Sequence, residues 1–140
     1  MELHRGRLID HVQLVVQDLP FMLRFYRAIL EPLGIPIGGE ADDHFFVDEL
    51  FFSTRTSKAA SGELTGRHHL AFQASSPEAV QRFHAAGLAA GGRDHGAPGE
   101  RTAYHPGYYA AFLLDPEGNN VEAVYHGAAE RSAPSVVLKF

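Results

Sequence analysis

The sequence of 140 residues contains no cysteine, no long apolar run and no long basic run. Without cysteine, disulfide bonds, thiolate metal ligands and cysteine nucleophiles are excluded, so a transition metal would be held by His, Asp, Glu or water. No apolar stretch approaches the roughly 20 residues that span a bilayer. The opening MELHRGR is too short and too polar for a signal peptide. The net charge of −5 argues against nucleic acid or a membrane surface as the main partner, and we expect a cytoplasmic protein.

The chain contains an internal repeat. HVQLVVQDLPFMLRFYRAIL, from His11, aligns without a gap on HLAFQASSPEAVQRFHAAGL, from His69. A repeat of this length indicates two copies of one supersecondary unit. Neighbouring residues of a strand point to opposite faces, so only one histidine of RHHLAF can enter a given site. The repeat selects His69 rather than His68.

Each copy is predicted to begin with a strand. In LIDHVQLVV, apolar residues alternate with His11 and Gln13, and in HHLAFQA they alternate with His69 and Gln73. The apolar face is expected to pack on a helix. The face that carries His and Gln is then left toward a cavity or solvent.

A helix follows each strand. The first is expected to start near Asp18 and end at Gly34, and the second to start at Ser75 or Ser76. Apolar residues recur at helical spacing in both. The residues at this spacing in the first helix are Met22, Phe25, Tyr26, Ile29 and Leu33, and the predicted buried stripe of the second is Val80, Phe83 and Leu88.

Short strands complete each copy. They are predicted near residues 36–38, 44–47 and 50–54, then at 108–114 and 119–126, with a DPEG turn between the last two. Residues 91–107, rich in glycine and proline, are predicted to form a long ordered loop, and such loops are often functional. The chain is therefore predicted to be one α+β domain, residues 1–140. Its parts are two βαβββ modules, 8–58 and 66–126, and a C-terminal tail, 127–140.

These elements resemble the vicinal oxygen chelate superfamily, which includes glyoxalase I, bleomycin-resistance proteins, fosfomycin-resistance enzymes and extradiol dioxygenases. The resemblance rests on IDHVQLVVQDL, FYRAIL, HHLAF and FLLDPEGNNVEAV, and covers about residues 8 to 126. It implies a curved mixed sheet around a cavity, helices on the outer face, and one divalent metal ion (Fe, Mn, Zn, Ni or Co). Carried over to this sequence, the metal ligands are His11, His69 and Glu122. Two imidazoles and one carboxylate leave roughly three of six positions open for a substrate that chelates through neighbouring oxygens.

Two further residues are candidates for catalysis. His105 and Tyr109 lie in or next to the aromatic-rich segment before the last two strands. One hypothesis is a lid whose histidine or tyrosine transfers a proton. The other is a loop packed over the sheet by its aromatic side chains.

Other side chains are candidates for substrate contact. Gln13 and Gln73 share the cavity face by parity, and are either substrate contacts or solvated surface. Phe112 stands where extradiol dioxygenases usually carry a tyrosine, and we expect it to contact substrate. Arg101 either binds an anionic substrate or is a solvated loop arginine.

Three functions are consistent with these residues. The first is a metal-dependent lyase or dioxygenase, glyoxalase-like or dioxygenase-like, that acts on a small molecule with neighbouring oxygens. The second is a non-catalytic binding or resistance protein that sequesters an antibiotic-like molecule in the same cavity, and the third is an interaction module without a ligand. The intact triad favours the enzyme, but ELFFSTR offers no glutamate in register for the fourth ligand that glyoxalase I typically has. A homodimer is expected, with the cavity built from one chain or from two.

Overall fold

The computed structural model describes residues 2–5, 9–60, 68–128 and 136–139. The start of the predicted first module at Leu8, part of the segment between the modules and most of the predicted tail lie outside these residues. Contacts divide the chain into two compact units. The first is made of Met1–Pro20, Pro36–Thr65 and Glu130–Phe140, and the second of Phe21–Ile35 and Gly66–Ala129.

The first unit holds a four-stranded mixed sheet with the strand order β2-β5-β4-β3. Its strands are β2 (Val12–Val15), β3 (Gly39–Glu40), β4 (His44–Val47) and β5 (Leu50–Ser53). β2 runs parallel to β5, and β4 is antiparallel to both of its neighbours. A strand is predicted near residues 36–38, but β3 starts one residue later, at Gly39.

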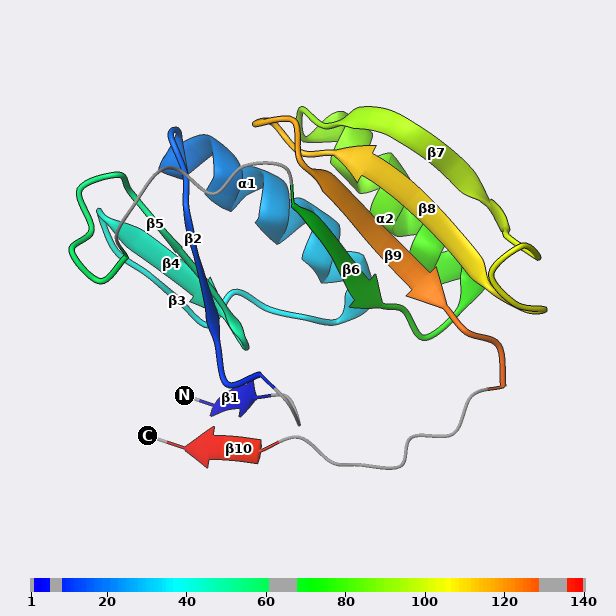
Figure 1. Ribbon diagram of the computed structural model, residues 1–140, viewed down its shortest axis with the longest axis horizontal. Coiled ribbons are helices and arrows are strands. Elements are labelled where there is room, and N and C mark those ends of the chain that lie inside the picture. Colours follow the sequence, from blue (N-terminus) through cyan, green and yellow to red (C-terminus); the bar gives the residue numbers. More distant parts are fainter. Residues whose placement is uncertain (1, 6–8, 61–67, 129–135, 140) are drawn as a thin grey trace. The chain divides into compact units, whose positions relative to one another are not determined.

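A separate antiparallel pair joins β1 (Glu2–Arg5) to β10 (Val136–Lys139). The two strands lie side by side although they come from opposite ends of the chain (Figure 1). Sequence patterns predict neither strand. The end of the predicted tail is therefore a paired strand.

The second unit repeats the topology in its own sheet, with the order β6-β9-β8-β7. Its strands are β6 (His69–Gln73), β7 (Arg93–Glu100), β8 (Tyr109–Leu114) and β9 (Asn120–Tyr125). β6 is parallel to β9, and the other pairs are antiparallel. Both halves therefore follow one β-α-β-β-β order, which confirms the α+β class and the predicted repeat (Figure 1).

Helix α1 (Leu19–Leu30) continues into a short 3-10 helix, η1 (Glu31–Leu33). Gly34 ends it in the left-handed conformation, with φ of 74°, where glycine carries no steric penalty. This is the end that the sequence predicts. Within the described residues, no helix is both long enough and apolar enough to cross a membrane.

Helix α2 (Pro77–Ala89) packs on the second sheet, mainly on β8 and β7. Ser76 caps its first turn. The buried residues of this helix are Ala79, Val80, Phe83 and Gly87. The prediction that Leu88 is buried was wrong: 44% of it is exposed. Gly87 lies one helical turn after Phe83 and takes the buried position, so Leu88 is rotated away from the sheet.

Gly87 lets the helix approach the sheet closely. A Cβ at this position would lie 2.2 Å from Leu113 Cδ1 and 3.1 Å from Ile29 Cγ2. We expect G87A to lower the free energy of unfolding, because overpacking costs ~1–3 kcal/mol. Alanine gains only ~0.5–1 kcal/mol over glycine in a helix. Urea unfolding measures the change.

The matched background for this test is Leu113→Ala, which removes the methyl group that the new Cβ would meet. In that background, Gly87→Ala should be neutral or stabilising, since the added methyl group fills space. A G87A variant that is more stable than the wild type in the presence of Leu113 would contradict the close approach.

Residues 91–107 were predicted to form a loop, and this prediction was wrong in its first half. Strand β7 pairs with β8 there, with register shifts between Asp94 and Gly96 and between Gly96 and Gly99. β7 is an edge strand, and Pro98 is tolerated at such an edge. The bulges and the proline interrupt the alternating pattern from which a strand is predicted.

Candidate metal and substrate site

Glu122 is a buried carboxylate on β9, with 2% of its surface exposed. Phe112 on β8 lies beside it in register. Helix α2 covers the other face of the sheet, because Leu113, which packs against Gly87, pairs with Val121. A buried charge is costly unless it is paired or binds a metal ion. The face that carries Glu122 is therefore the candidate functional surface of this unit.

Both carboxylate oxygens of Glu122 have hydrogen-bond partners. His69 Nε2 lies 2.8 Å from Oε2, and the Tyr108 hydroxyl donates to Oε1. An ionised carboxylate only accepts, so His69 Nε2 carries a proton and donates it. Within the described segments, no lysine or arginine pairs with Glu122. The buried negative charge therefore has an imidazole and a phenol as its partners.

Tyr108 is held as a proton donor. Burial raises its pKa, and the hydrogen bond to Glu122, the charge of Glu122 and the nearby Tyr104 raise it further. Tyr108 is therefore protonated at neutral pH. Sequence reasoning chose Tyr109 instead, whose hydroxyl accepts a 3.0 Å hydrogen bond from Gln81 of α2. The catalytic role of Tyr109 stays a prediction.

His105, the other predicted catalytic residue, belongs to a pair of histidines. Its Nδ1 donates to Pro106 O at 2.8 Å, so its Nε2 accepts from His126 Nδ1 at 2.9 Å. The Tyr108 ring packs edge-on against both imidazoles, with centroid distances of 5.2 and 5.3 Å. The pair therefore flanks the tyrosine that reaches Glu122. Sequence reasoning did not select His126 as a site residue, although alternation along β9 places it on the Glu122 face.

Phe112 and Gln73 are the predicted substrate contacts in this unit. The Phe112 ring meets the His69 ring edge-on, with 6.0 Å between centroids. Gln73 is exposed and pairs in register with Val124, which shares its face of the sheet with Glu122. Both side chains are thus on the candidate surface, and their contact with substrate stays a prediction.

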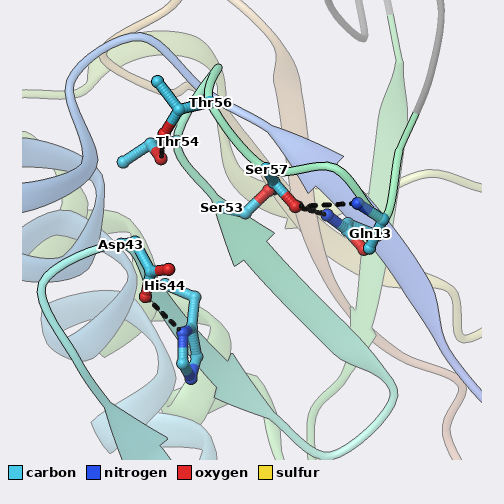
Figure 2. Close-up of polar contacts among 8 residues, drawn as sticks. Gln13, Asp43, His44, Ser53, Thr54, Thr56 and Ser57 are labelled. Carbon is cyan, nitrogen blue, oxygen red and sulfur yellow. Dashed lines mark hydrogen bonds and ion pairs between the residues drawn. The ribbon is translucent and has the colours of Figure 1, made fainter.

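The predicted site residues of the first repeat lie in the first unit. His11 is exposed, and its Nδ1 lies 2.6 Å from Asp10 Oδ1. The Gln13 amide donates to Ser53 Oγ at 2.9 Å and to Ser57 Oγ at 3.0 Å (Figure 2). The amide of Gln13 is therefore used to hold the end of β5 and the segment after it.

The metal triad predicted from the sequence is His11, His69 and Glu122. In the parts of the chain that the structure describes, no group of three or more His, Asp or Glu side chains is close enough to hold a metal ion. His69 and Glu122 are in direct contact. The place of His11 in the site stays a prediction.

The strand register accounts for the missing fourth ligand. Gln13 lies opposite Phe51 in the first sheet, and Ala71 lies opposite Glu122 in the second. Gln13 corresponds to Ala71 when the repeats are aligned. Phe51 therefore occupies in the first sheet the place that Glu122 occupies in the second. This agrees with the inference from ELFFSTR that no glutamate stands there.

His68 is chemically unlike its neighbour His69. Burial lowers the pKa of His68, and this effect exceeds that of the charges of Asp115 and Glu117, which raise the pKa. Its Nδ1 is buried without a hydrogen-bond partner among the described residues. His68 is therefore a neutral, partly buried side chain, and His69 is the histidine that reaches Glu122.

A family model for the Glyoxalase/Bleomycin resistance protein/Dioxygenase superfamily matches residues 8–123. The chain belongs to this superfamily. The match spans both repeats, and it confirms the resemblance drawn from the motifs. Members of the superfamily typically bind a divalent metal ion and small molecules. A search of curated proteins gave no match.

Solved structures are similar over most of the chain. A glyoxalase/bleomycin resistance protein from Albidiferax ferrireducens T118 is 34% identical, with a TM-score of 0.70, and the alignment covers 84% of this chain and 98% of that one. A glyoxalase/bleomycin resistance protein/dioxygenase family enzyme from Burkholderia phytofirmans PsJN is 25% identical, with coverage of 84% and 97% and a TM-score of 0.66. A lactoylglutathione lyase from Agrobacterium tumefaciens is 18% identical, with coverage of 85% and 93% and a TM-score of 0.62, and shows the shared fold alone.

Proposed function

We propose that this protein is a metal-dependent enzyme, lyase or dioxygenase in type, that acts on a small molecule with neighbouring oxygens. The observation that carries the proposal is the buried carboxylate of Glu122 in contact with His69. His69 lies on β6 and Glu122 on β9, and the parallel pairing of these two strands brings the side chains together. Membership of the superfamily supports the proposed reaction type. The contact between His69 and Glu122 supports the proposed location of the site.

The donors of this site fit a divalent ion. An imidazole nitrogen and a carboxylate oxygen are ligands that Fe, Mn, Zn, Ni and Co all accept. A divalent cation would supply the positive charge that Glu122 does not receive from any lysine or arginine of the described segments. For His69 Nε2 to bind the ion, its proton would move to Nδ1 or to solvent, so metal affinity should fall as the pH is lowered.

His11 enters the proposal as the third ligand from the repeat and from the family pattern. It holds in the first repeat the position that His69 holds in the second. It could be supplied by the same chain or by a second copy in a homodimer. Size measurement by light scattering, for the wild type and for His11→Ala, separates a dimeric protein from a monomeric one.

The chain's own residues would serve the reaction in distinct ways. A bound divalent ion would polarise the chelating oxygens of the substrate or activate dioxygen. Tyr108 holds Glu122 in place through its hydroxyl. His105 and His126 provide imidazole nitrogens that take up or return a proton beside Tyr108.

The alternative is a binding protein that sequesters a planar molecule without turnover. Aromatic rings on the first sheet favour it: His44 stacks on Phe51 with 4.9 Å between centroids, and Phe46 lies 6.4 Å from the same ring. His44 is itself held by Asp43 at 2.8 Å (Figure 2). Under this alternative, ligand binding persists in metal-free protein.

Metal content tests the enzyme proposal. We expect near-stoichiometric metal in anaerobically purified or reconstituted wild-type protein, and loss of that metal in His69→Ala. His95→Ala is the matched control, because His95 is exposed on β7, and it should keep the metal. Elemental analysis provides the measurement. Undiminished metal in His69→Ala, or none in the reconstituted wild type, would overturn the proposal.

A further inference from the structure

Arg101 stands where β7 turns toward β8, on the candidate surface. Its backbone N–H donates to Tyr108 O at 2.7 Å, which fixes the start of the turn. Its guanidinium lies over the Phe112 ring, with Cζ 5.6 Å from the ring centroid. The same ring meets His69. One phenylalanine therefore contacts both the cation and the imidazole that reaches Glu122.

Two glycines make room for this guanidinium. A Cβ on Gly99 would lie 2.9 Å from Arg101 Nη1, and one on Gly96 would lie 3.4 Å from Nη2 and 2.9 Å from Phe112 Cδ2. Nη2 also donates to Ala97 O at 2.7 Å. The side chain therefore lies along the bare backbone of β7, next to the Phe112 ring.

Among the described residues, Arg101 forms no ion pair with an acidic side chain, although the protein as a whole carries a net charge of −5. The neighbouring Glu100 instead accepts the N–H of Gly107 at 3.0 Å. A guanidinium has five N–H donors in a planar fork, and the only acceptor assigned to those of Arg101 among the described residues is Ala97 O.

We propose that Arg101 binds an anionic oxygen group of the substrate, a carboxylate or a phosphonate. Such groups match the planar fork of a guanidinium, which can hold two oxygens at once. The proposal rests on the proposed function in one respect, that the neighbouring oxygens of the same molecule lie near His69 and Glu122. The substrate class is then a small acid that carries both an anionic group and a pair of chelating oxygens.

The anion subsite is tested first without any metal. We titrate metal-free protein with benzoate and with its neutral analogue benzamide, and follow the amide signals of Gly96 and Gly99 and the Arg101 Nε–H signal by NMR. Benzoate should shift these signals saturably, with half-saturation on the order of millimolar, as for a single charge-assisted contact. Benzamide should not. An absence of saturable shifts with benzoate would overturn the proposal.

Variants assign the effect to Arg101. Arg101→Met should abolish the benzoate shifts, whereas Arg93→Met, which removes an exposed arginine from the start of β7, should leave them in place. Gly99→Ala keeps the arginine but puts a methyl group against Nη1, and should weaken benzoate binding. Benzoate shifts that persist unchanged in Arg101→Met would place the anion elsewhere and refute the proposal.

A second pair of probes separates this proposal from the proposed function. Catechol and 3,4-dihydroxybenzoate share the neighbouring oxygens and differ in one carboxylate. Metal-loaded wild type should bind the acid about 10-fold more tightly than catechol, and Arg101→Met should bind the two alike. Equal affinities in the wild type would overturn the anion subsite. If neither diol binds while the benzoate result holds, the chelation proposal fails and the anion subsite stands.

Discussion

Glu122→Gln is expected to keep the fold and to weaken divalent-metal binding by more than ~100-fold. Glutamine preserves the shape of the side chain, but it removes the negative charge that would face the ion. Loss of a residue that only supports a metal ligand already costs ~10–100-fold in affinity, so loss of a ligand should cost more. Competition with a chromophoric chelator, using Zn²⁺ or Co²⁺, measures the affinity.

Glu100→Gln is the matched control for this change. Glu100 is an exposed carboxylate in the same unit, bonded to a backbone N–H, and its replacement should leave metal affinity unchanged. Tyr108 gives a second readout, since the charge of Glu122 contributes to its raised pKa. In Glu122→Gln the pKa of Tyr108 should fall, while burial keeps it above the ordinary value. Equal metal affinities in Glu122→Gln and the wild type would show that Glu122 is not a ligand.

Asp115→Ala is expected to cause a large loss of stability, ~3–5 kcal/mol, because several hydrogen bonds to one buried carboxylate disappear together. Asp115 is 1% exposed. Its Oδ1 accepts the N–H groups of Glu117 and Asn119 at 2.9 and 3.0 Å, and its Oδ2 accepts the Tyr26 hydroxyl at 3.0 Å. The residue thus holds the β8–β9 turn and ties it to α1. Urea unfolding gives the free energy.

Tyr26→Phe separates the two tasks of Asp115. It removes the tie to α1 and leaves the turn intact, so the loss should be ~1–2 kcal/mol, smaller than in Asp115→Ala. Burial first, and then the charge of Asp115, raise the pKa of Tyr26, so its hydroxyl is a donor throughout the ordinary pH range. If Asp115→Ala unfolded at the same urea concentration as the wild type, the turn would not depend on this carboxylate.

Much of the fold follows from local patterns in the sequence. The repeat that begins at His11 and at His69 predicted two units of one topology, and the sheets have the same strand order. The DPEG segment predicted a tight turn, and Gly118 N–H donates to Asp115 O at 2.9 Å. These features can be predicted because hydrophobic periodicity and turn formation each depend on residues that are close together in the sequence.

Other features depend on pairings that a local pattern does not contain. β7 is bulged at Gly96 and Gly99, so it carries no alternating signal. β1 and β10 are short strands from opposite ends of the chain, and each has the other as its pairing partner. The contacts that define such strands form across long sequence separations.

Strand alternation in the sequence could have identified Tyr108, rather than Tyr109, as the tyrosine on the face that carries Glu122. Tyr108, which directly precedes β8, shares one face with Ala110 and Phe112 by alternation, and Phe112 was already predicted to contact substrate. The same parity places Tyr108 beside Phe112 and turns Tyr109 toward α2, as the contacts of both hydroxyl groups show. The contact between His105 and His126, by contrast, depends on how the turn folds back over β9.

A crystal structure of the metal-loaded protein, with anomalous scattering recorded at the metal edge, determines whether His69 and Glu122 bind one metal ion. We expect an anomalous peak about 2.0–2.2 Å from both His69 Nε2 and a carboxylate oxygen of Glu122. The same map shows whether His11 completes the site, and from which chain. An anomalous peak elsewhere in the protein, with His69 and Glu122 still hydrogen-bonded to each other, would show that these residues do not bind the metal.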